Sequence, residues 1–231
     1  MKVSYGITVC NENYELHRLL NLLLPNTSVV GDEVVVLVDK NNTTQDVLDT
    51  LNYSKKLYDH DHFKWFYGEL NNDFSQFKND LNSKCSGEYI FQIDADEIPS
   101  DGLIGSNLHN LLNENDLVEL FLIPRINTIA YDDEDSFKEY CNSQGWFLNN
   151  DNDQGEYWIN FPDNQARIYK NLDRIEWLGK VHERIVGAKS FSILHSDLDL
   201  DVVKKYYHLK HHKTLEKQKC QNELYSDIIS K

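Results

Sequence analysis

The segment GEYIFQIDADEIP, residues 87–99, is a run of strand-forming residues that ends in a cluster of three carboxylates, Asp94, Asp96 and Glu97. Its first half is aromatic or β-branched, which is typical of a strand buried on both faces of a mostly parallel sheet. Ligands bind at the carboxyl ends of such strands, and clustered carboxylates repel one another unless a cation lies between them. Hard oxygen ligands favour Mg²⁺ or Mn²⁺ over zinc.

On the N-terminal side of this segment, strands alternate with helices. The hydrophobic patterns predict strands at 3–9, 33–38, 63–67 and 88–93, and helices from residue 11 to Pro25, at 45–58 and at 74–84. This alternation predicts an α/β fold with a mostly parallel central sheet and helices on both faces.

The pattern loosens after Pro99. We expect a helix at 102–113, a strand at 117–123, an irregular acidic region with a short helix at 133–140, and a helical segment from residue 199 onward. Short strands at 157–161, 166–169, 181–186 and 191–194 predict a smaller mixed or antiparallel portion. We interpret residues 1–231 as one domain, with a first half (1–100), a second half (101–198) and a C-terminal helical segment (199–231).

The composition narrows the class of protein. The formal net charge of −15 disfavours non-specific binding to nucleic acid or to anionic membranes. The four cysteines are scattered singly, as in a cytoplasmic protein with reduced thiols. The sequence has neither a signal-peptide pattern nor an apolar run of about 18 residues, so we expect a cytoplasmic protein without a membrane span.

Polar residues follow three of the predicted strands: residues 8–12, Asp39, and residues 94–97. The carboxyl ends of parallel strands meet at one edge of a sheet, where binding sites form. Asp94 and Asp96 are two residues apart, so in an extended segment both side chains would project the same way and could share a cation that holds a diphosphate. The alternative for an isolated Asp-x-Asp, and for Asp39, is a turn or a helix cap.

Three stretches carry a resemblance to a known family: VSYGITVCNENYELHRLLNLL (3–23), VVVLVDKNNTTQDVL (34–48) and DFSQFKNDLNSKCSGEYIFQIDADE (73–97). In order and spacing they resemble the N-terminal half of family 2 nucleotide-sugar glycosyltransferases of the GT-A fold. The nearest type is the bacterial lipopolysaccharide-core glucosyltransferases, in which DADE is followed later by a Val-His-Glu tripeptide, here within LGKVHERI (178–185).

The resemblance implies that residues 1–100 are the nucleotide-sugar-binding half and residues 101–198 the acceptor-side half, and it implies a role for each matching residue. Asp39 would contact the base or its ribose, and Lys78, where the family often has Arg, would assist the nucleotide or its phosphates. Asp94 and Asp96 would form the metal-binding DxD pair, with Asp96 as the direct ligand. The resemblance also places in the nucleotide-sugar site Thr8, Asn11, Glu12, Asn79 and Ala95. The loop KNNTTQD (40–46) departs from the usual acidic turn, which leaves the base of the donor open, with a UDP-sugar as the favoured donor. The absence of a Gln-x-x-Arg-Trp motif favours transfer of a single sugar.

Inverting sugar transfer requires a base that deprotonates the acceptor hydroxyl. Glu183 and His182 are the candidates, and the resemblance favours Glu183. On a strand, neighbouring side chains point to opposite faces, so only one of the two would face the site. A structural, hydrogen-bonded role is the alternative for His182.

The segment 204–219 concentrates lysines and histidines. On a helix, His208 would lie beside both His211 and His212. His208 and His211 are candidate metal ligands, and Lys210 and Lys213 candidate diphosphate contacts. Either a mobile lid over the donor or an exposed basic helix would account for this segment.

Aromatic residues of the second half offer stacking surfaces for an acceptor, although core packing explains most such residues. We favour Trp146 and Trp158 as acceptor contacts. The others in this region are Phe147, Tyr157 and Trp177.

These observations predict an inverting, metal-dependent glycosyltransferase that uses Mn²⁺ or Mg²⁺ and acts on a glycan or lipopolysaccharide-like acceptor. A hydroxymethylated base in DNA is the second acceptor, with the basic segment meeting phosphates. The alternatives of another class are a nucleotidyltransferase, which usually has a Gly-rich phosphate loop that is absent from CNENYE (10–15), and a non-catalytic nucleotide-sugar-binding module.

Overall fold

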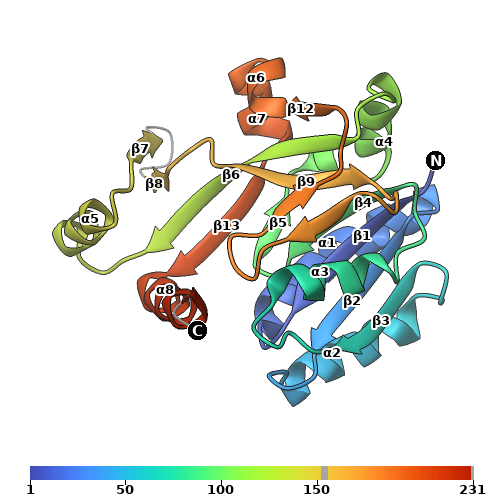
Figure 1. Ribbon diagram of the computed structural model, residues 1–231, viewed down its shortest axis with the longest axis horizontal. Helices are drawn as coiled ribbons and strands as arrows, with labels where there is room; N and C mark the ends of the chain where they lie inside the picture. The colour runs from blue at the N-terminus through green and yellow to red at the C-terminus, as the bar shows by residue number, and fades with distance from the viewer. Residues whose placement is uncertain (152–155, 230–231) are drawn as a thin grey trace.

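The computed structural model describes residues 1–151 and 156–229, which form an α/β fold around one large mixed sheet (Figure 1). The first half confirms the predicted alternation. Parallel strands β1 (Val3–Val9), β2 (Glu33–Asp39), β3 (Phe63–Gly68) and β4 (Tyr89–Asp94) lie in the order β3-β2-β1-β4. The helices between them are α1 (Asn13–Val30), α2 (Gln45–Leu57) and α3 (Phe74–Asn82).

Helices cover both faces of this parallel part, as predicted. Leu16 of α1 and Leu51 of α2 pack in one core cluster with Val36 of β2. On the other face, Phe77 of α3 packs against Leu37 of β2. Because successive residues of β2 point to opposite faces and the whole strand is buried, it reads as a continuous apolar run.

Helix α1 does not stop at Pro25, and that prediction is wrong. The helix continues for more than a turn to Val30, and the capping residue Gly31 has a left-handed φ of 81° and donates its N–H to Thr27 O. Proline removes one helical hydrogen bond, but Leu24 and Thr27 on either side of it are buried against the core. Burial of the last turn therefore outweighs the local signal to stop.

The second half supplies the mixed portion that the sequence predicts. Strand β9 (Asn164–Lys170) runs antiparallel to both β4 and the long β6 (Leu120–Ala130). An arm of α5 (Glu134–Ser143), β7 (Leu148–Asp151) and β8 (Glu156–Ile159) projects from the far end of β6 (Figure 1). The remaining elements before residue 200 are β5 (Glu97–Pro99), a 3₁₀ turn (Asp101–Leu103), α4 (Gly105–Glu114), β10 (Glu176–Leu178), β11 (Arg184–Val186), β12 (Phe191–Ile193) and α6 (Leu194–Asp197).

The C-terminal segment is not continuously helical, which corrects the prediction for residues 199 onward. Helix α7 (Leu200–Tyr206) is followed by strand β13 (Leu209–Thr214) and then by α8 (Leu215–Ile229). Strand β13 pairs in parallel with β6 and antiparallel with β5, so Leu209 and His211 are buried on the same face. The helical grouping of the three histidines is therefore wrong, because on a strand His211 and His212 point to opposite faces.

Among the residues that the structure describes, no helix combines the length and the apolarity needed to cross a bilayer.

Candidate active site

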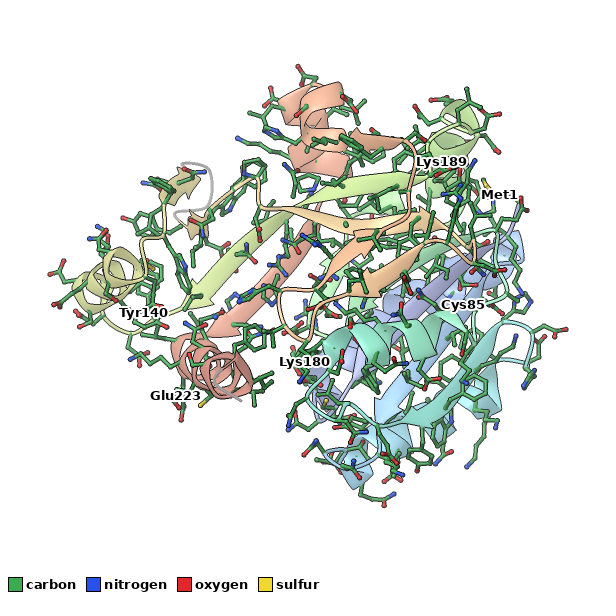
Figure 2. The ribbon with its side chains drawn as sticks, viewed as in Figure 1. Met1, Cys85, Tyr140, Lys180, Lys189 and Glu223 are labelled. Atoms are coloured by element: carbon green, nitrogen blue, oxygen red, sulfur yellow. The ribbon has the colours of Figure 1, made fainter. Side chains whose placement is uncertain are left out.

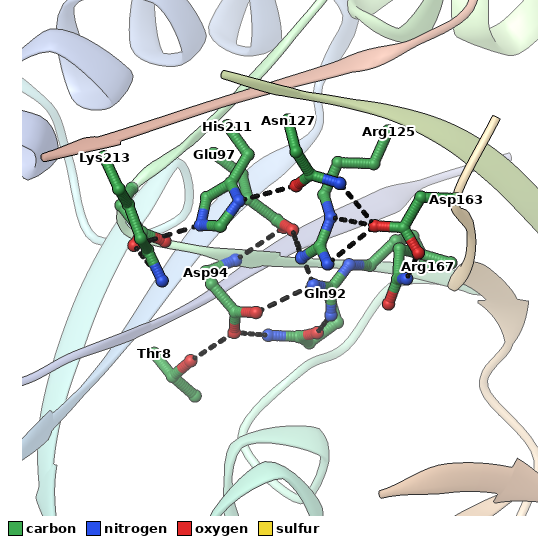
Figure 3. A network of polar contacts seen from close by, with 12 residues as sticks. Thr8, Gln92, Asp94, Glu97, Arg125, Asn127, Asp163, Arg167, His211 and Lys213 are labelled. Atoms are coloured by element: carbon green, nitrogen blue, oxygen red, sulfur yellow. Dashed lines mark hydrogen bonds and ion pairs between the residues drawn. The ribbon is translucent and has the colours of Figure 1, made fainter. Parts of the chain in front are cut away.

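Asp94 lies at the carboxyl end of β4 and accepts hydrogen bonds on both carboxylate oxygens (Figure 3). Its Oδ1 accepts from Thr8 Oγ1 at 3.1 Å and from Gln92 Nε2 at 3.0 Å, and its Oδ2 accepts from Arg167 Nη2 at 2.7 Å. Burial alone would raise the pKa of Asp94, but Arg167 and then Lys78 outweigh it and hold that pKa well below its usual range. Asp94 is therefore an ionised carboxylate engaged by protein donors.

Arg167 is the residue of this site that the sequence did not reveal. It is 3% exposed and comes from β9, beside β4. Besides Asp94, it donates to Gln92 Oε1 at 2.6 Å and to Glu97 Oε1 at 2.6 Å. The only signal in the sequence is a single arginine within the predicted strand at 166–169. Buried charges need such pairing, so Arg167 and the two carboxylates stabilise one another.

Glu97 braces this cluster. Its side chain is fully buried, accepts from Arg125 Nη1 at 3.0 Å as well as from Arg167, and receives the backbone N–H of Asp94 at 3.2 Å. With these partners, Glu97 fixes the turn after β4 rather than facing a ligand.

Asp96 has a different environment from Asp94. The chain turns at Ala95 and Asp96 instead of staying extended, so the predicted parallel projection of the two aspartates is wrong. Asp96 Oδ2 lies 3.4 Å from His211 Nε2 and 3.3 Å from Lys213 Nζ, both on β13. Burial alone would raise the pKa of Asp96, but His211 and Lys213 hold it below its usual range.

The orientation of His211 is fixed by its neighbours. Its Nδ1 lies 2.8 Å from Asn127 Oδ1, while Asn127 Nδ2 donates to Asp163 Oδ2 at 2.7 Å (Figure 3). Since Asp163 can only accept, the Asn127 oxygen faces the imidazole and must receive a hydrogen from Nδ1. His211 therefore presents Nε2 to the Asp96 carboxylate.

The Asp96 carboxylate and His211 Nε2 are ligand atoms that fit a divalent cation. Histidine ligands of metals usually donate their second ring N–H to a fixed acceptor, as His211 does to Asn127. Mg²⁺ sites in phosphate-binding proteins use one or two side chains and complete the shell with phosphate oxygens and water. Asp96 and His211 could thus supply two ligand atoms to Mg²⁺ or Mn²⁺.

The predicted four-residue metal set is not assembled. Within residues 1–151 and 156–229, no three His, Cys, Asp or Glu side chains come together to hold a metal. Asp94 is engaged by Arg167 and Thr8, and His208 is buried with its Nδ1 3.3 Å from Val203 O. His208 precedes β13 (Leu209–Thr214), and its ring lies against the backbone of Val203 in α7. The prediction of His208 as a ligand is wrong.

His208 should make stability depend on pH. Burial lowers its pKa to about 4, so the folded protein keeps a neutral imidazole, whereas the unfolded chain binds a proton near about pH 6.5. As the pH falls through that value, protons bind the unfolded state in preference. We expect the free energy of unfolding to drop by about 1 kcal/mol more in the wild type than in His208→Leu between about pH 7.5 and about pH 5.5. Urea denaturation at both pH values measures this, and equal pH dependence of the two proteins would contradict it.

Lys78 connects Asp94 to the candidate base. Its side chain is 5% exposed, and its Nζ lies 2.5 Å from Glu183 Oε1 and 3.5 Å from Asp94 Oδ1. The ammonium also sits over the ring of Trp177, 4.6 Å from its centroid. The sequence predicted that Lys78 assists the nucleotide. In the structure its nearest anions are these two carboxylates.

The predicted strand at 181–186 is confirmed only for β11 (Arg184–Val186). Glu183 and His182 lie in the loop between β10 and β11, so their predicted place on a strand is wrong. His182 has a left-handed φ of 52°. Its ring packs edge-on against Tyr225, with 5.5 Å between the ring centroids. Figure 2 places Lys180, in the same loop, between α3 and α8. Of the two candidates, Glu183 is the one that faces Asp94 through Lys78.

The remaining predicted residues surround the ends of β1 and β2. Asp39 is fully buried and accepts hydrogen bonds from Asn41 N and Leu70 N, both at 3.3 Å, so it holds the turn after β2. Glu12 accepts from the backbone of Cys10 and Asn11, which closes the loop after β1.

Two further residues of the predicted set have structural contacts. Ala95 is buried, and its N–H donates to Thr8 O at 3.2 Å. The amide of Asn79 forms two hydrogen bonds with the backbone of Trp177, which ties α3 to β10. Trp177 and Trp158 are 3% and 9% exposed, so both are largely buried. Trp146 is half-buried, and the roles of Trp146 and Trp158 as acceptor contacts stay predictions.

This chain is similar in fold to solved structures. No protein-family model and no curated protein sequence matches this chain. Among solved structures, S. aureus TarS residues 1–349 match with a TM-score of 0.56 and 16% identity over 92% of this chain and 60% of that one. The same protein in complex with UDP-GlcNAc gives a TM-score of 0.54, 15% identity, and coverage of 92% and 59%. Its complex with UDP matches with a TM-score of 0.54 and 14% identity over 92% of this chain and 60% of that one.

The chain therefore spans about 60% of the length of these TarS structures. At this identity the likeness concerns the fold alone, which is the GT-A glycosyltransferase fold that the resemblance implied.

Proposed function

We propose that this protein is an inverting glycosyltransferase that moves one sugar from a nucleoside-diphosphate sugar, with UDP as the favoured nucleotide, to an acceptor hydroxyl. One observation carries the proposal: the buried ammonium of Lys78 lies within 2.5 Å of Glu183 and 3.5 Å of Asp94. A candidate base is thereby held beside the carboxylates at the sheet edge where nucleotides bind in open α/β folds.

The donor would lie at the carboxyl ends of β1, β2 and β4. Thr8, Asn11 and Glu12 would border the nucleotide, and Asp39 would shape the turn that closes its pocket. The structures of TarS with UDP-GlcNAc and with UDP support this class of ligand, because the two proteins share a fold over most of this chain.

Asp96 and His211 would hold Mn²⁺ or Mg²⁺ together with the diphosphate, since they are the pair whose donor atoms fit such an ion. When bound, the ion would offset the negative charge that develops on the departing diphosphate. Lys213, 3.3 Å from Asp96, adds a positive charge on the same side.

Glu183 would act as the general base. Lys78 holds Oε1, and we assign Oε2 to accept the proton of the acceptor hydroxyl. The acceptor oxygen then bonds to the anomeric carbon while the bond from that carbon to the diphosphate breaks, and the nucleoside diphosphate leaves. Lys78 keeps the carboxylate in place throughout.

The acceptor that we favour is a glycan of the lipopolysaccharide type, from the resemblance of the DADE and VHE segments. A DNA acceptor is disfavoured by the contacts of the basic segment. Lys213 faces Asp96 and Lys217 pairs with Glu15 at 2.6 Å, so these lysines are engaged within the protein.

Titration calorimetry with UDP tests the donor and the cation together. We expect UDP to bind the wild type in the presence of Mn²⁺ and to bind at least about tenfold more weakly in Asp96→Asn or after chelation, because the ion joins the protein to the diphosphate. Asp46→Asn, an exposed aspartate of α2, is the matched control and should bind like the wild type.

Equal UDP affinity with and without Mn²⁺ would refute the proposed role of the cation in holding the diphosphate. Failure of the wild type to bind any nucleotide of a UDP and GDP panel would refute the proposed function.

A further inference from the structure

Two side chains of α8 connect the two sides of the candidate site. Lys213 Nζ, 3.3 Å from Asp96 Oδ2, donates to Gln221 Oε1 at 2.6 Å. Gln221 Nε2 in turn donates to the hydroxyl of Tyr225 at 2.8 Å. The ring of Tyr225 then packs edge-on against His182, next to Glu183, with 5.5 Å between centroids. The chain of contacts thus runs from Asp96 to the loop that carries the candidate base.

Helix α8 is fixed in this position from three directions. The ring of Tyr225 also packs edge-on against Phe74 at the start of α3, at 5.8 Å. Asn222 donates to Tyr140 Oη of α5 at 3.1 Å, and Lys217 pairs with Glu15 of α1. Helix α8 therefore follows the end of β13 and contacts the start of α3 through Tyr225 (Figure 1).

Inverting transfer sets where the sugar must lie. The acceptor oxygen attacks the anomeric carbon opposite the departing diphosphate, so the sugar lies between the diphosphate and the base. Asp96 marks the diphosphate side and Glu183 the base side. Gln221 and Tyr225 span the interval between these two positions.

The chemistry of the two side chains suits a sugar ring. The Tyr225 oxygen accepts from Gln221 and retains its own hydrogen to donate. Burial and the charges of Asp94, Glu183 and Asp96 raise the pKa of Tyr225 to about 12, so the phenol stays a donor at neutral pH. Its ring adds an apolar face against which a pyranose can pack.

We propose that Tyr225 and Gln221 of α8 contact the transferred sugar and determine which sugar the protein accepts. This inference rests on the proposed function and assigns recognition of the donor sugar to α8. The nucleotide is held elsewhere, at the ends of β1 and β2, so sugar recognition and nucleotide recognition should separate on mutation.

Tyr225→Phe separates sugar recognition from nucleotide recognition, because it removes the hydroxyl and keeps the ring that packs on Phe74 and His182. We expect the Kd for UDP to stay within about twofold, while kcat/KM for the preferred UDP-hexose falls about tenfold, as for loss of one substrate hydrogen bond. The ratio of kcat/KM between UDP-glucose, UDP-galactose and UDP-GlcNAc should change by at least about threefold. Tyr53→Phe, an exposed tyrosine of α2, should match the wild type in every measurement.

Two results would overturn the inference. One is an unchanged ratio among the three UDP-sugars. The other is an equal loss of affinity for UDP and for UDP-sugar, which would assign Tyr225 a structural role. A wild-type protein that binds no nucleoside diphosphate would refute the proposed function itself, whereas a wild type that turns over UDP-sugars with Tyr225→Phe indistinguishable from it would refute the sugar-reading role alone.

Discussion

Glu183→Gln is expected to lower kcat for sugar transfer by about 10²- to 10⁴-fold, because the amide cannot accept the acceptor proton. The Kd of the nucleotide sugar should stay within about threefold, since the glutamine oxygen can still accept the hydrogen bond from Lys78. Steady-state kinetics and calorimetry on the same preparation measure the two quantities. Glu176→Gln, an exposed residue of the neighbouring strand β10, is the matched control.

Retained turnover in Glu183→Gln would assign the base elsewhere. Loss of donor binding in parallel with loss of turnover would instead show that Glu183 serves to position Lys78 and Asp94.

Arg167→Met is expected to lower the free energy of unfolding by about 3–5 kcal/mol, because it leaves two carboxylates without their shared buried cation. Asp94 and Glu97 both bond to its Nη2, at 2.7 and 2.6 Å. Urea denaturation measures the loss, and Arg184→Met at an exposed site should cost less than about 0.5 kcal/mol.

The effect of Arg167→Met should also depend on pH. Arg167 lowers the folded-state pKa of Asp94, so this contribution to stability is present above the unfolded-state pKa of about 3.9 and is lost as the pH falls below it. The difference between the wild type and the variant should therefore narrow on acidification. A loss below about 1 kcal/mol at neutral pH would contradict the central role given to Arg167.

The first half of the fold could be predicted because its signals are local. Strand β2 has a continuous apolar run, and β1, β3 and β4 are rich in aromatic and β-branched residues. The helices between them place their apolar residues at helical spacing. Strand β13 could not be predicted in this way. Its sequence LKHHKT is polar, and it is a strand only because β6 and β5, far away in the sequence, supply its hydrogen-bond partners.

The residues of the candidate site also differ in whether local sequence could identify them. Asp96, Glu183 and His211 could be named from motifs and residue type, and the structure brings each to the same region. Arg167 could not, because a single arginine carries no signal until the pairing of β9 with β4 places it beside Asp94. Tyr225 and Gln221 likewise depend on the packing of α8 beside β13 and the start of α3.

We expect this site to transfer a sugar from a nucleotide with inversion at the anomeric carbon. Proton NMR of the wild type with α-linked UDP-glucose, UDP-GlcNAc and GDP-mannose, in Mg²⁺ and with water as the acceptor, tests it most directly. We predict slow consumption of one donor, with the β-anomer of the free sugar appearing first and with Glu183→Gln inactive. Consumption of none of the donors, or first appearance of the α-anomer, would contradict the account.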